Sequence, residues 1–195
     1  MRSRRLKIAL VLSASAAGML IAVCFAWFGI ETGPGGETWH AVAVDDGFCS
    51  ALLPRRIEYR EIPSGDSRPP VREWSGWLEE SSYSIAIIPV ESRPKQQQLD
   101  LIENSAVELA AEYDGHVIRS VPAFVDGYEG RRQLIDTGSI IFDQYMFVVG
   151  QKAITAKADY RTGMRPTRLV EYFLANFRIN NCSVNDEQVG IQIGG

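Results

Sequence analysis

The chain has 195 residues, of which 46% are hydrophobic and 23% charged, and its formal net charge at pH 7 is −4. Four basic residues precede position 8, so the chain after residue 30 holds 16 basic against 24 acidic side chains. This acidic balance argues against a nucleic-acid partner, which favours a basic surface, and the remaining length suits one domain with a substantial core.

An apolar segment runs from residue 8 to residue 30 without a charged side chain. As a helix it would extend about 35 Å at about 1.5 Å per residue, enough to cross a hydrocarbon core of about 30 Å. The basic residues before it and Glu31 after it place the N-terminus in the cytoplasm. We therefore predict a basic cytoplasmic tail at 1–7, a single transmembrane signal anchor at 8–30 and an extracytoplasmic domain.

Two alternatives to an uncleaved anchor remain open. The stretch 14–16 reads Ala-Ser-Ala, which has the residue types of a leader cleavage site, but a long uncharged run follows it. Cys24 could carry a lipid, but Val23 stands where a lipidation motif usually has a small residue. The length of the run favours the anchor, with the indole of Trp27 near the outer interface.

The next part of the chain predicts a linker and then a series of strands. The glycine-rich linker ETGPGGE at 31–37 spans about 25 Å when fully extended, which would keep the domain close to the membrane. A turn is expected at 45–47 (DDG), because Asp and Gly accept positive φ angles, and a loop at 63–70. Five strands rich in β-branched and aromatic residues are expected at 38–44, 48–53, 56–62, 71–77 and 83–90.

A helix follows, because apolar residues recur three and four positions apart. They are Leu99, Ile102, Ala106, Leu109, Ala110 and Tyr113. Asp114-Gly115 is expected to end this helix, with the glycine in a left-handed conformation. Four more strands are expected at 116–125, 131–137, 139–149 and 152–159.

A second helix is expected to open at Arg165-Pro166 and to end at Asn180-Asn181. Its apolar stripe consists of Val170, Phe173, Leu174 and Phe177. Consecutive strands with tight turns pair antiparallel, and helices at intervals cover a sheet face. We therefore predict an α+β domain at 38–182, with an antiparallel sheet flanked by helices, followed by a polar tail at 183–195.

Three stretches resemble the PsbP-like superfamily: DDGFCSALLP at 45–54, MFVVGQKAITAKAD at 146–159 and TRLVEYFLANFRI at 167–179. That superfamily includes extrinsic photosystem II proteins, a nuclear-import Ran-release factor and many bacterial envelope proteins of unknown role. The likeness covers about residues 38–180 and lies in packing patterns. It implies an α/β/α sandwich, a short strand near 177–179 after the last helix, and a non-catalytic accessory or assembly role in the bacterial envelope. It transfers no functional residue.

The sequence offers few candidates for chemistry. Cys49 and Cys182 could form a disulfide outside the cytoplasm or could be two small buried side chains. The two histidines are far apart and no CxxC or HExxH motif occurs, so neither a metal site nor a cofactor is predicted. Asp114-Gly115-His116 puts an acid near an imidazole, but no GxSxG motif accompanies it, so we predict no catalytic residue.

Two pairs of residues are candidates for contact with a partner. Trp74 and Trp77 are three apart, so on a strand they would face opposite sides, and an exposed indole is a frequent interface residue. Arg131 and Arg132 follow a glycine-bearing turn and could meet an acidic partner or lipid headgroups, or could be solvated surface charges.

We therefore expect a membrane-anchored, non-enzymatic accessory domain that binds a protein partner near the membrane. The alternative is a module that binds a small ligand or lipid between sheet and helices. A hydrolase that uses His116 is a more distant alternative.

Overall fold

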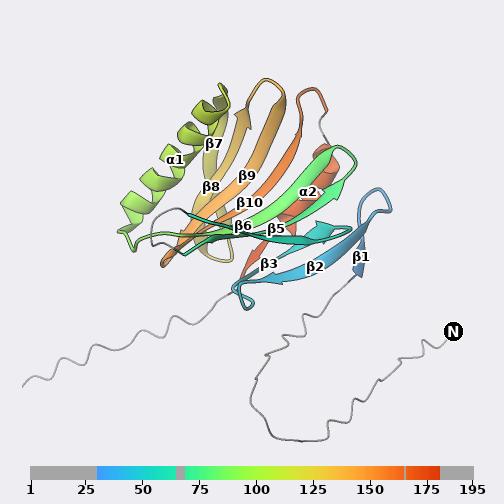
Figure 1. Cartoon of the computed structure of the whole chain (residues 1–195), viewed down its shortest axis with the longest axis horizontal. Helices are drawn as coiled ribbons and strands as arrows, with labels where there is room; N and C mark the ends of the chain where they lie inside the picture. The colour runs from blue at the N-terminus through green and yellow to red at the C-terminus, as the bar shows by residue number, and fades with distance from the viewer. Residues whose placement is uncertain (1–29, 65–68, 165, 181–195) are drawn as a thin grey trace, which may run out of the picture.

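The computed structural model describes residues 30–64, 69–164 and 166–180, and it contains two antiparallel sheets in these ranges (Figure 1). The small sheet has the order β1 (Ile30–Thr32), β2 (Thr38–Val44), β3 (Cys49–Pro54) and β11 (Arg178–Ile179). The large sheet has the order β4 (Glu58–Ile62), β5 (Val71–Leu78), β6 (Ser81–Pro89), β10 (Lys152–Arg161), β9 (Ile140–Val149), β8 (Tyr128–Asp136) and β7 (His116–Val125). β4 and β7 are its edge strands, and every residue of β4 is exposed.

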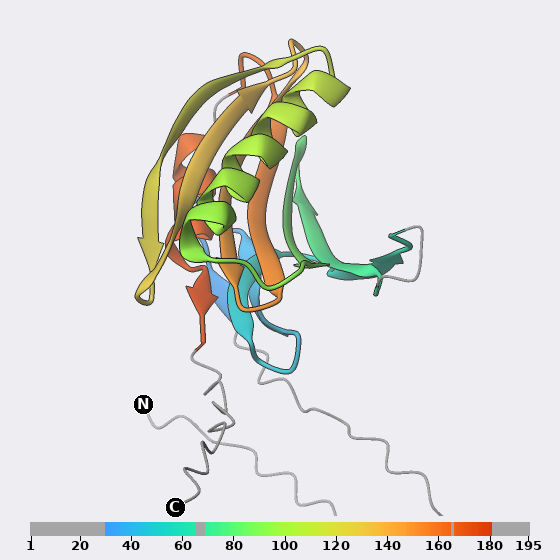
Figure 2. The same ribbon diagram turned by 90° about the vertical axis from the view of Figure 1, so that its left-hand side faces the viewer.

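Two helices lie on opposite faces of the large sheet (Figures 1 and 2). The helix α1 (Lys95–Glu112) packs on β7, β8 and β9. The helix α2 (Thr167–Ala175) packs on the other face, against β9, β10 and the small-sheet strand β3. The main core therefore lies between the large sheet and the layer formed by α2 and the small sheet. The predicted α+β class with an antiparallel sheet between helices is confirmed.

Strand alternation assigns the side chains of the large sheet to these two faces. On β10, Ile154, Ala156 and Ala158 are fully buried in the main core. The residues that alternate with them point to the α1 side, where Ala153 packs with Ile102 of the helix. This is the period of two that the sequence of β10 predicts.

An ion-pair cluster connects the two sheets. Asp45, in the turn between β2 and β3, lies 2.6 Å from a guanidinium nitrogen of Arg72 on β5 and 2.7 Å from Nζ of Lys152 on β10. Lys152 also lies over the ring of Phe48, 4.2 Å from its centroid. Burial alone would raise the pKa of the Asp45 carboxyl, but Lys152 and Arg72 outweigh it and hold that pKa below its ordinary value.

The start of the domain differs from the prediction. The sequence predicts a flexible linker at 31–37, whereas Ile30–Thr32 pairs with β2 and the N–H of Gly33 donates to the carbonyl of Glu37, which closes a hairpin. The described domain therefore starts at the last residue predicted for the anchor. The rest of the apolar segment 8–30 lies outside the described residues, as do Cys24 and the tail 183–195. Neither helix within the described ranges has the length and apolar character needed to cross a bilayer.

The end of α1 is predicted correctly, but for the wrong reason. Asp114, with φ of 53°, has the left-handed conformation that the sequence assigns to Gly115. Gly115 is required instead by close approach, because a Cβ there would clash with the carbonyl oxygen of Asp136 on β8. The glycine thus lets the chain enter β7 directly beside β8.

The end of α2 is five residues earlier than the predicted stop at Asn180-Asn181. Phe177, which the sequence assigns to the helical stripe, follows the helix and is fully buried, with its ring 6.0 Å from that of Phe147. Arg178–Ile179 then pairs with β3. The short strand that the PsbP-like resemblance implies near 177–179 is confirmed.

Candidate functional site

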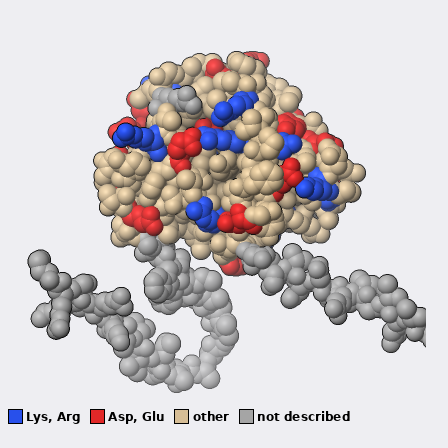
Figure 3. Space-filling view, turned by 180° about the vertical axis from the view of Figure 1, so that it is seen from behind, with Lys and Arg blue, Asp and Glu red and all other residues tan. Residues whose placement is uncertain are grey.

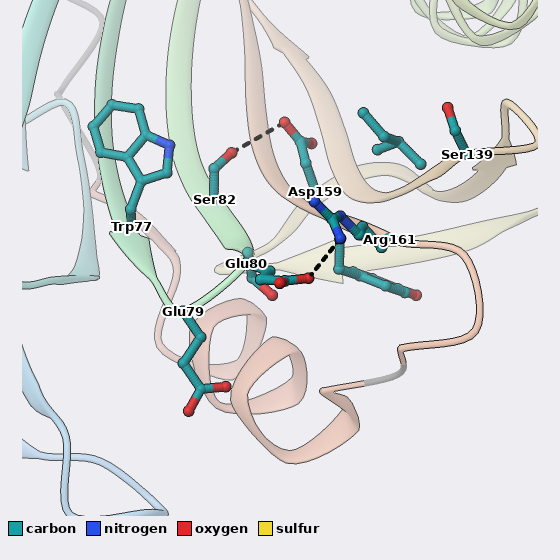
Figure 4. Close-up of a pocket in the computed structure, with 10 residues that line it drawn as sticks. Trp77, Glu79, Glu80, Ser82, Ser139, Asp159 and Arg161 are labelled. Atoms are coloured by element: carbon teal, nitrogen blue, oxygen red, sulfur yellow. Dashed lines mark hydrogen bonds and ion pairs between the residues drawn. The ribbon is translucent and has the colours of Figure 1, made fainter.

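The most distinctive surface of the domain is the half of the large sheet that α1 leaves open. The helix packs on β7, β8 and β9, and β5, β6 and the end of β10 extend beyond it on the same face. A cavity of about 590 Å³ opens there, a volume within the range of small-ligand sites. Figure 4 shows its lining, which consists of Trp77, Glu79, Glu80, Ser81, Ser82, Ser139, Ile140, Asp159, Tyr160 and Arg161.

Three of these side chains form a row across neighbouring strands. Trp77 on β5 is directly opposite Ser82 on β6, and Ser82 is directly opposite Asp159 on β10. Adjacent strands are about 4.8 Å apart, so the backbones of Trp77 and Asp159 are about 10 Å apart. Ser82 lies between them (Figure 4). The pairing of three strands therefore assembles the site from residues up to 82 positions apart in the chain.

Asp159 has an unusual environment for a carboxylate. Its Oδ2 accepts a hydrogen bond of 3.1 Å from Ser82 and lies 3.3 Å from Nζ of Lys157. Its Oδ1 is buried, and no described residue donates a hydrogen bond to it. Burial raises the pKa of Asp159 above its ordinary value, although Lys157 and Ser82 counteract part of this effect.

The two candidate tryptophans lie on opposite faces of the large sheet, as their spacing predicts. Trp74 points toward the main core, and its ring lies 5.0 Å from that of Tyr59. Trp77 lines the cavity and is 40% exposed, and the guanidinium of Arg60 lies 5.9 Å from the centroid of its ring. Trp77 is therefore the indole that remains available to a partner.

The two candidate arginines are both engaged inside the domain. Arg131 points to the α1 side, where its Nε lies 2.7 Å from Glu103. Arg132 points to the α2 side, where it binds Asp143 through two hydrogen bonds of 2.9 and 2.8 Å and also contacts Glu171. Both guanidiniums are thus held in ion pairs within the domain, and both side chains are mostly buried.

The other candidates lie away from the cavity. His116 is exposed at the start of β7, across the sheet from β5. Cys49 is buried at the start of β3, and Cys182, with which it could form a disulfide, lies outside the described residues. On the face turned away from the viewer in Figure 1, the described basic and acidic side chains lie next to one another rather than in patches of one sign (Figure 3).

The sequence interpretation missed Ser82 and Asp159. Their signal is the alternation within two strands, where polar Ser82 and Ser84 alternate with Tyr83 on β6 and Lys157 and Asp159 flank Ala158 on β10. This pattern predicts a polar face on each strand, but it does not say which strands are neighbours or in which register.

No family model and no curated protein matches the chain. Solved structures do match it. The solution structure of cyanobacterial PsbP (CyanoP) from Synechocystis sp. PCC 6803 aligns with 73% of this chain and 92% of its own, with a TM-score of 0.53 and 12% sequence identity. The chain has the PsbP-like fold. A crystal structure of a protein from Bacteroides thetaiotaomicron VPI-5482 matches 72% of this chain and 48% of its own, with 7% identity and a TM-score of 0.38, too low to support an argument.

The PsbP-like resemblance from the sequence is thus confirmed at the level of the fold. At 12% identity, this likeness to CyanoP indicates how the strands and helices are arranged and assigns no function to the residues of the cavity. The function must be argued from the site itself.

Proposed function

We propose that this chain is a membrane-anchored, non-enzymatic accessory domain of the bacterial envelope that binds a protein partner through the open half of the α1-side sheet face. The observation that carries the proposal is the exposed indole of Trp77 beside the cavity on that face. Large aromatic side chains are enriched at protein interfaces, where they fill pockets of the partner or border pockets of their own.

The position of the site relative to the membrane supports the proposal. The apolar segment 8–30 and the basic residues before it favour an anchor with the domain outside the cytoplasm. Strand β1 begins at Ile30, the last residue of this apolar segment. If the segment is an anchor, the domain is held near the membrane surface, where a membrane-bound partner has a high effective concentration.

Site-specific photo-cross-linking in the source cells tests the proposal. A photoreactive amino acid at position 77 of the full-length chain is expected to form a cross-link with one defined protein. The matched control is the same amino acid at Phe124, which is 69% exposed on β7 at the other side of the sheet. The proposal fails if position 77 gives no cross-linked protein, or the same set of proteins as position 124. Cross-linking after Trp74→Phe is expected to be unchanged.

The alternative of a small-ligand module is favoured by one observation, the volume of the cavity, which suits a small molecule as well as a side chain. Native mass spectrometry of the full-length chain in mild detergent separates the two functions. A co-purifying protein supports the accessory domain, and an added small mass on a single chain supports the ligand-binding module.

A further inference from the structure

The open half of the α1-side sheet face is a groove with a floor of small side chains. Beside the cavity described above, a second cavity of about 220 Å³ opens between Glu73 on β5 and Leu109 on α1. The two cavities lie end to end along β6. Ser82 lines the first, and Ser84 and Ala86, which follow on the same face of the strand, line the second. We call this surface the β6 groove.

The width of the β6 groove is that of one helix. Adjacent strands are about 4.8 Å apart, so the three strands β10, β6 and β5 span about 10 Å, and an α-helix with its side chains is about 10–12 Å across. The helix α1 itself packs on three strands of the same sheet, β7, β8 and β9. The strands that it leaves open therefore offer room for one more helix beside it (Figure 2).

The flank of α1 that borders the groove has a row of residues suited to helix packing. Leu101, Ser105 and Leu109 are four residues apart, so they lie on one side of the helix, and all three are half-buried. Ser105 and Leu109 line the second cavity. Rows of residues four apart are the ridges by which helices pack against each other, and the small serine leaves a gap between the two leucines.

A chain that binds in this groove must pair its own main-chain groups. The floor is the face of a sheet, which presents side chains, and the strands β5, β6 and β10 are each paired with a neighbour on both sides. An extended segment would find few partners there for its N–H and C=O groups, whereas a helix pairs them internally. The geometry therefore favours a helix over a strand.

The charges around the groove are complementary to a helix with basic flanks. Glu73 lies on the β5 side. Glu108 and Glu112 come seven and eleven residues after Leu101, which places them on the groove flank of α1. None of these three carboxylates has an ion pair with a described residue. The basic side chains at the groove already have acidic partners: Arg60 with Glu58 at 3.1 Å, Lys157 with Asp159 at 3.3 Å and Arg161 with Glu80 at 3.3 Å. The unpaired charge on both sides of the groove is therefore negative.

We propose that the β6 groove binds an amphipathic α-helix of the protein partner, which lies beside α1 and carries lysine or arginine on both flanks. This inference rests on the proposed function and names the element that the partner contributes. The apolar stripe of the helix would cover the small side chains of the floor and reach Trp77 at one end of the groove. The basic flanks would face Glu73 on one side and Glu108 and Glu112 on the other.

The positions of the two cavities set the spacing of large side chains on the bound helix. From Ser82 in the first cavity to Ala86 in the second, β6 advances about 13 Å at about 3.3 Å per residue. Residues seven or eight positions apart on a helix are about 11–12 Å apart along its axis. Two leucines at this spacing can therefore enter both cavities, with small residues between them.

The test is a titration of the ¹⁵N-labelled full-length chain in non-ionic detergent with the synthetic peptide Ac-AQKLKQAAQKLKQKAK-amide, which has this leucine spacing and lysines on both flanks. The indole N–H signal of Trp77, identified as the one lost in Trp77→Phe, reports binding, and the signal of the fully buried Trp39 reports folding. One control peptide replaces every lysine by glutamate. The other, Ac-AKLKAKAKLKAKQQQQ-amide, has the same composition with the alternation of a strand.

We expect a saturable shift of the Trp77 signal with the basic helical peptide and weaker binding of both controls. Ala86→Phe fills the second cavity and is expected to weaken binding about tenfold or more, with the Trp39 signal unchanged. The matched variant Val107→Phe is expected to bind normally. Val107 is 60% exposed and comes two residues after Ser105, so it lies on the other side of α1. Glu73→Gln removes one flanking charge and is expected to weaken binding about two- to fivefold.

Three results would overturn the inference: no shift with the basic helical peptide, an equal shift with the alternating peptide, or equal binding by Ala86→Phe and Val107→Phe. This titration and the cross-linking experiment fail independently. A cross-linked partner at position 77 without peptide binding would overturn the helix inference and leave the accessory function standing. Peptide binding without any cross-linked protein would overturn the accessory function and leave the groove as a site for a basic helix.

Discussion

Arg131 and Arg132 are adjacent in sequence, but the structure predicts very different consequences for their replacement. Arg132→Met keeps most of the aliphatic stem and removes the guanidinium that binds both oxygens of Asp143. The Asp143 side chain is only 7% exposed, so its charge would be left buried and unpaired. Breaking a buried pair in this way destabilises a domain by about 3–5 kcal/mol.

The contribution from the second partner of Arg132 is small. Glu171 is 51% exposed, so water screens its charge, and losing this arm costs about 1 kcal/mol or less. Arg131→Met is the matched control. It leaves behind Glu103, which is 44% exposed and still accepts a hydrogen bond from Ser120, so its cost is about 1 kcal/mol or less.

Chemical denaturation of the full-length chain in non-ionic detergent, followed by tryptophan fluorescence, measures both free energies of unfolding. The double variant Arg132→Met/Asp143→Val removes the unpaired charge as well, and valine suits a strand, so it is expected to recover most of the loss. The reasoning is refuted if Arg131→Met and Arg132→Met are destabilised equally. It is also refuted if the double variant is less stable than Arg132→Met alone.

Two further predictions concern the core and the acid response of the domain. A Cβ at Gly130, whose φ is not positive, would clash with the carbonyl oxygen of Met146 and the ring of Phe147, so Gly130→Ala is expected to lower the free energy of unfolding by about 1–3 kcal/mol. An unchanged denaturation midpoint would contradict this. The Asp45 ion pairs lower the pKa of that carboxyl in the folded domain. The stabilisation that they give is therefore fully present above the ordinary, unfolded-state pKa of about 4. It is lost as the pH falls through the lower pKa of the folded domain. The stability difference between the original chain and Asp45→Asn should therefore shrink below about pH 4, and a difference independent of pH would rule out the ion pairs as its cause.

The strand pattern of this fold was predictable because local signals agree with the tertiary structure. Thr38–Val44 is a strand within the same bounds in the sequence prediction and in the structure. Asp45, Asp46 and Gly47 all have the positive φ angles expected for the turn that follows. Such turns fix which strands are neighbours, so the hairpins follow from the sequence alone.

The candidate site was predictable only in part, because it depends on the register of strands that are distant in the chain. Trp77 could be singled out as one of two indoles with opposite orientation, and Asp159 could not be joined to it without the pairing of β6 with β10. For Arg131 and Arg132 the sequence errs in the other direction, because it makes them candidates for contact with a partner. The sequence presents them as surface charges, and only the positions of Glu103 and Asp143 show that they are used internally.

The two outer strands of the large sheet also determine how the domain behaves among neighbouring copies of itself. An open strand edge invites another chain to add to the sheet, which leads to aggregation. Charged Glu58, Arg60 and Glu61 lie along β4, and β7 has a bulge at 117–119 and, at Pro122, a residue without a backbone N–H. Both edges therefore disfavour strand addition, so neighbouring copies can be packed closely without forming a continuous sheet. The partner that we propose would accordingly contact side chains on the face of the sheet and not its edges.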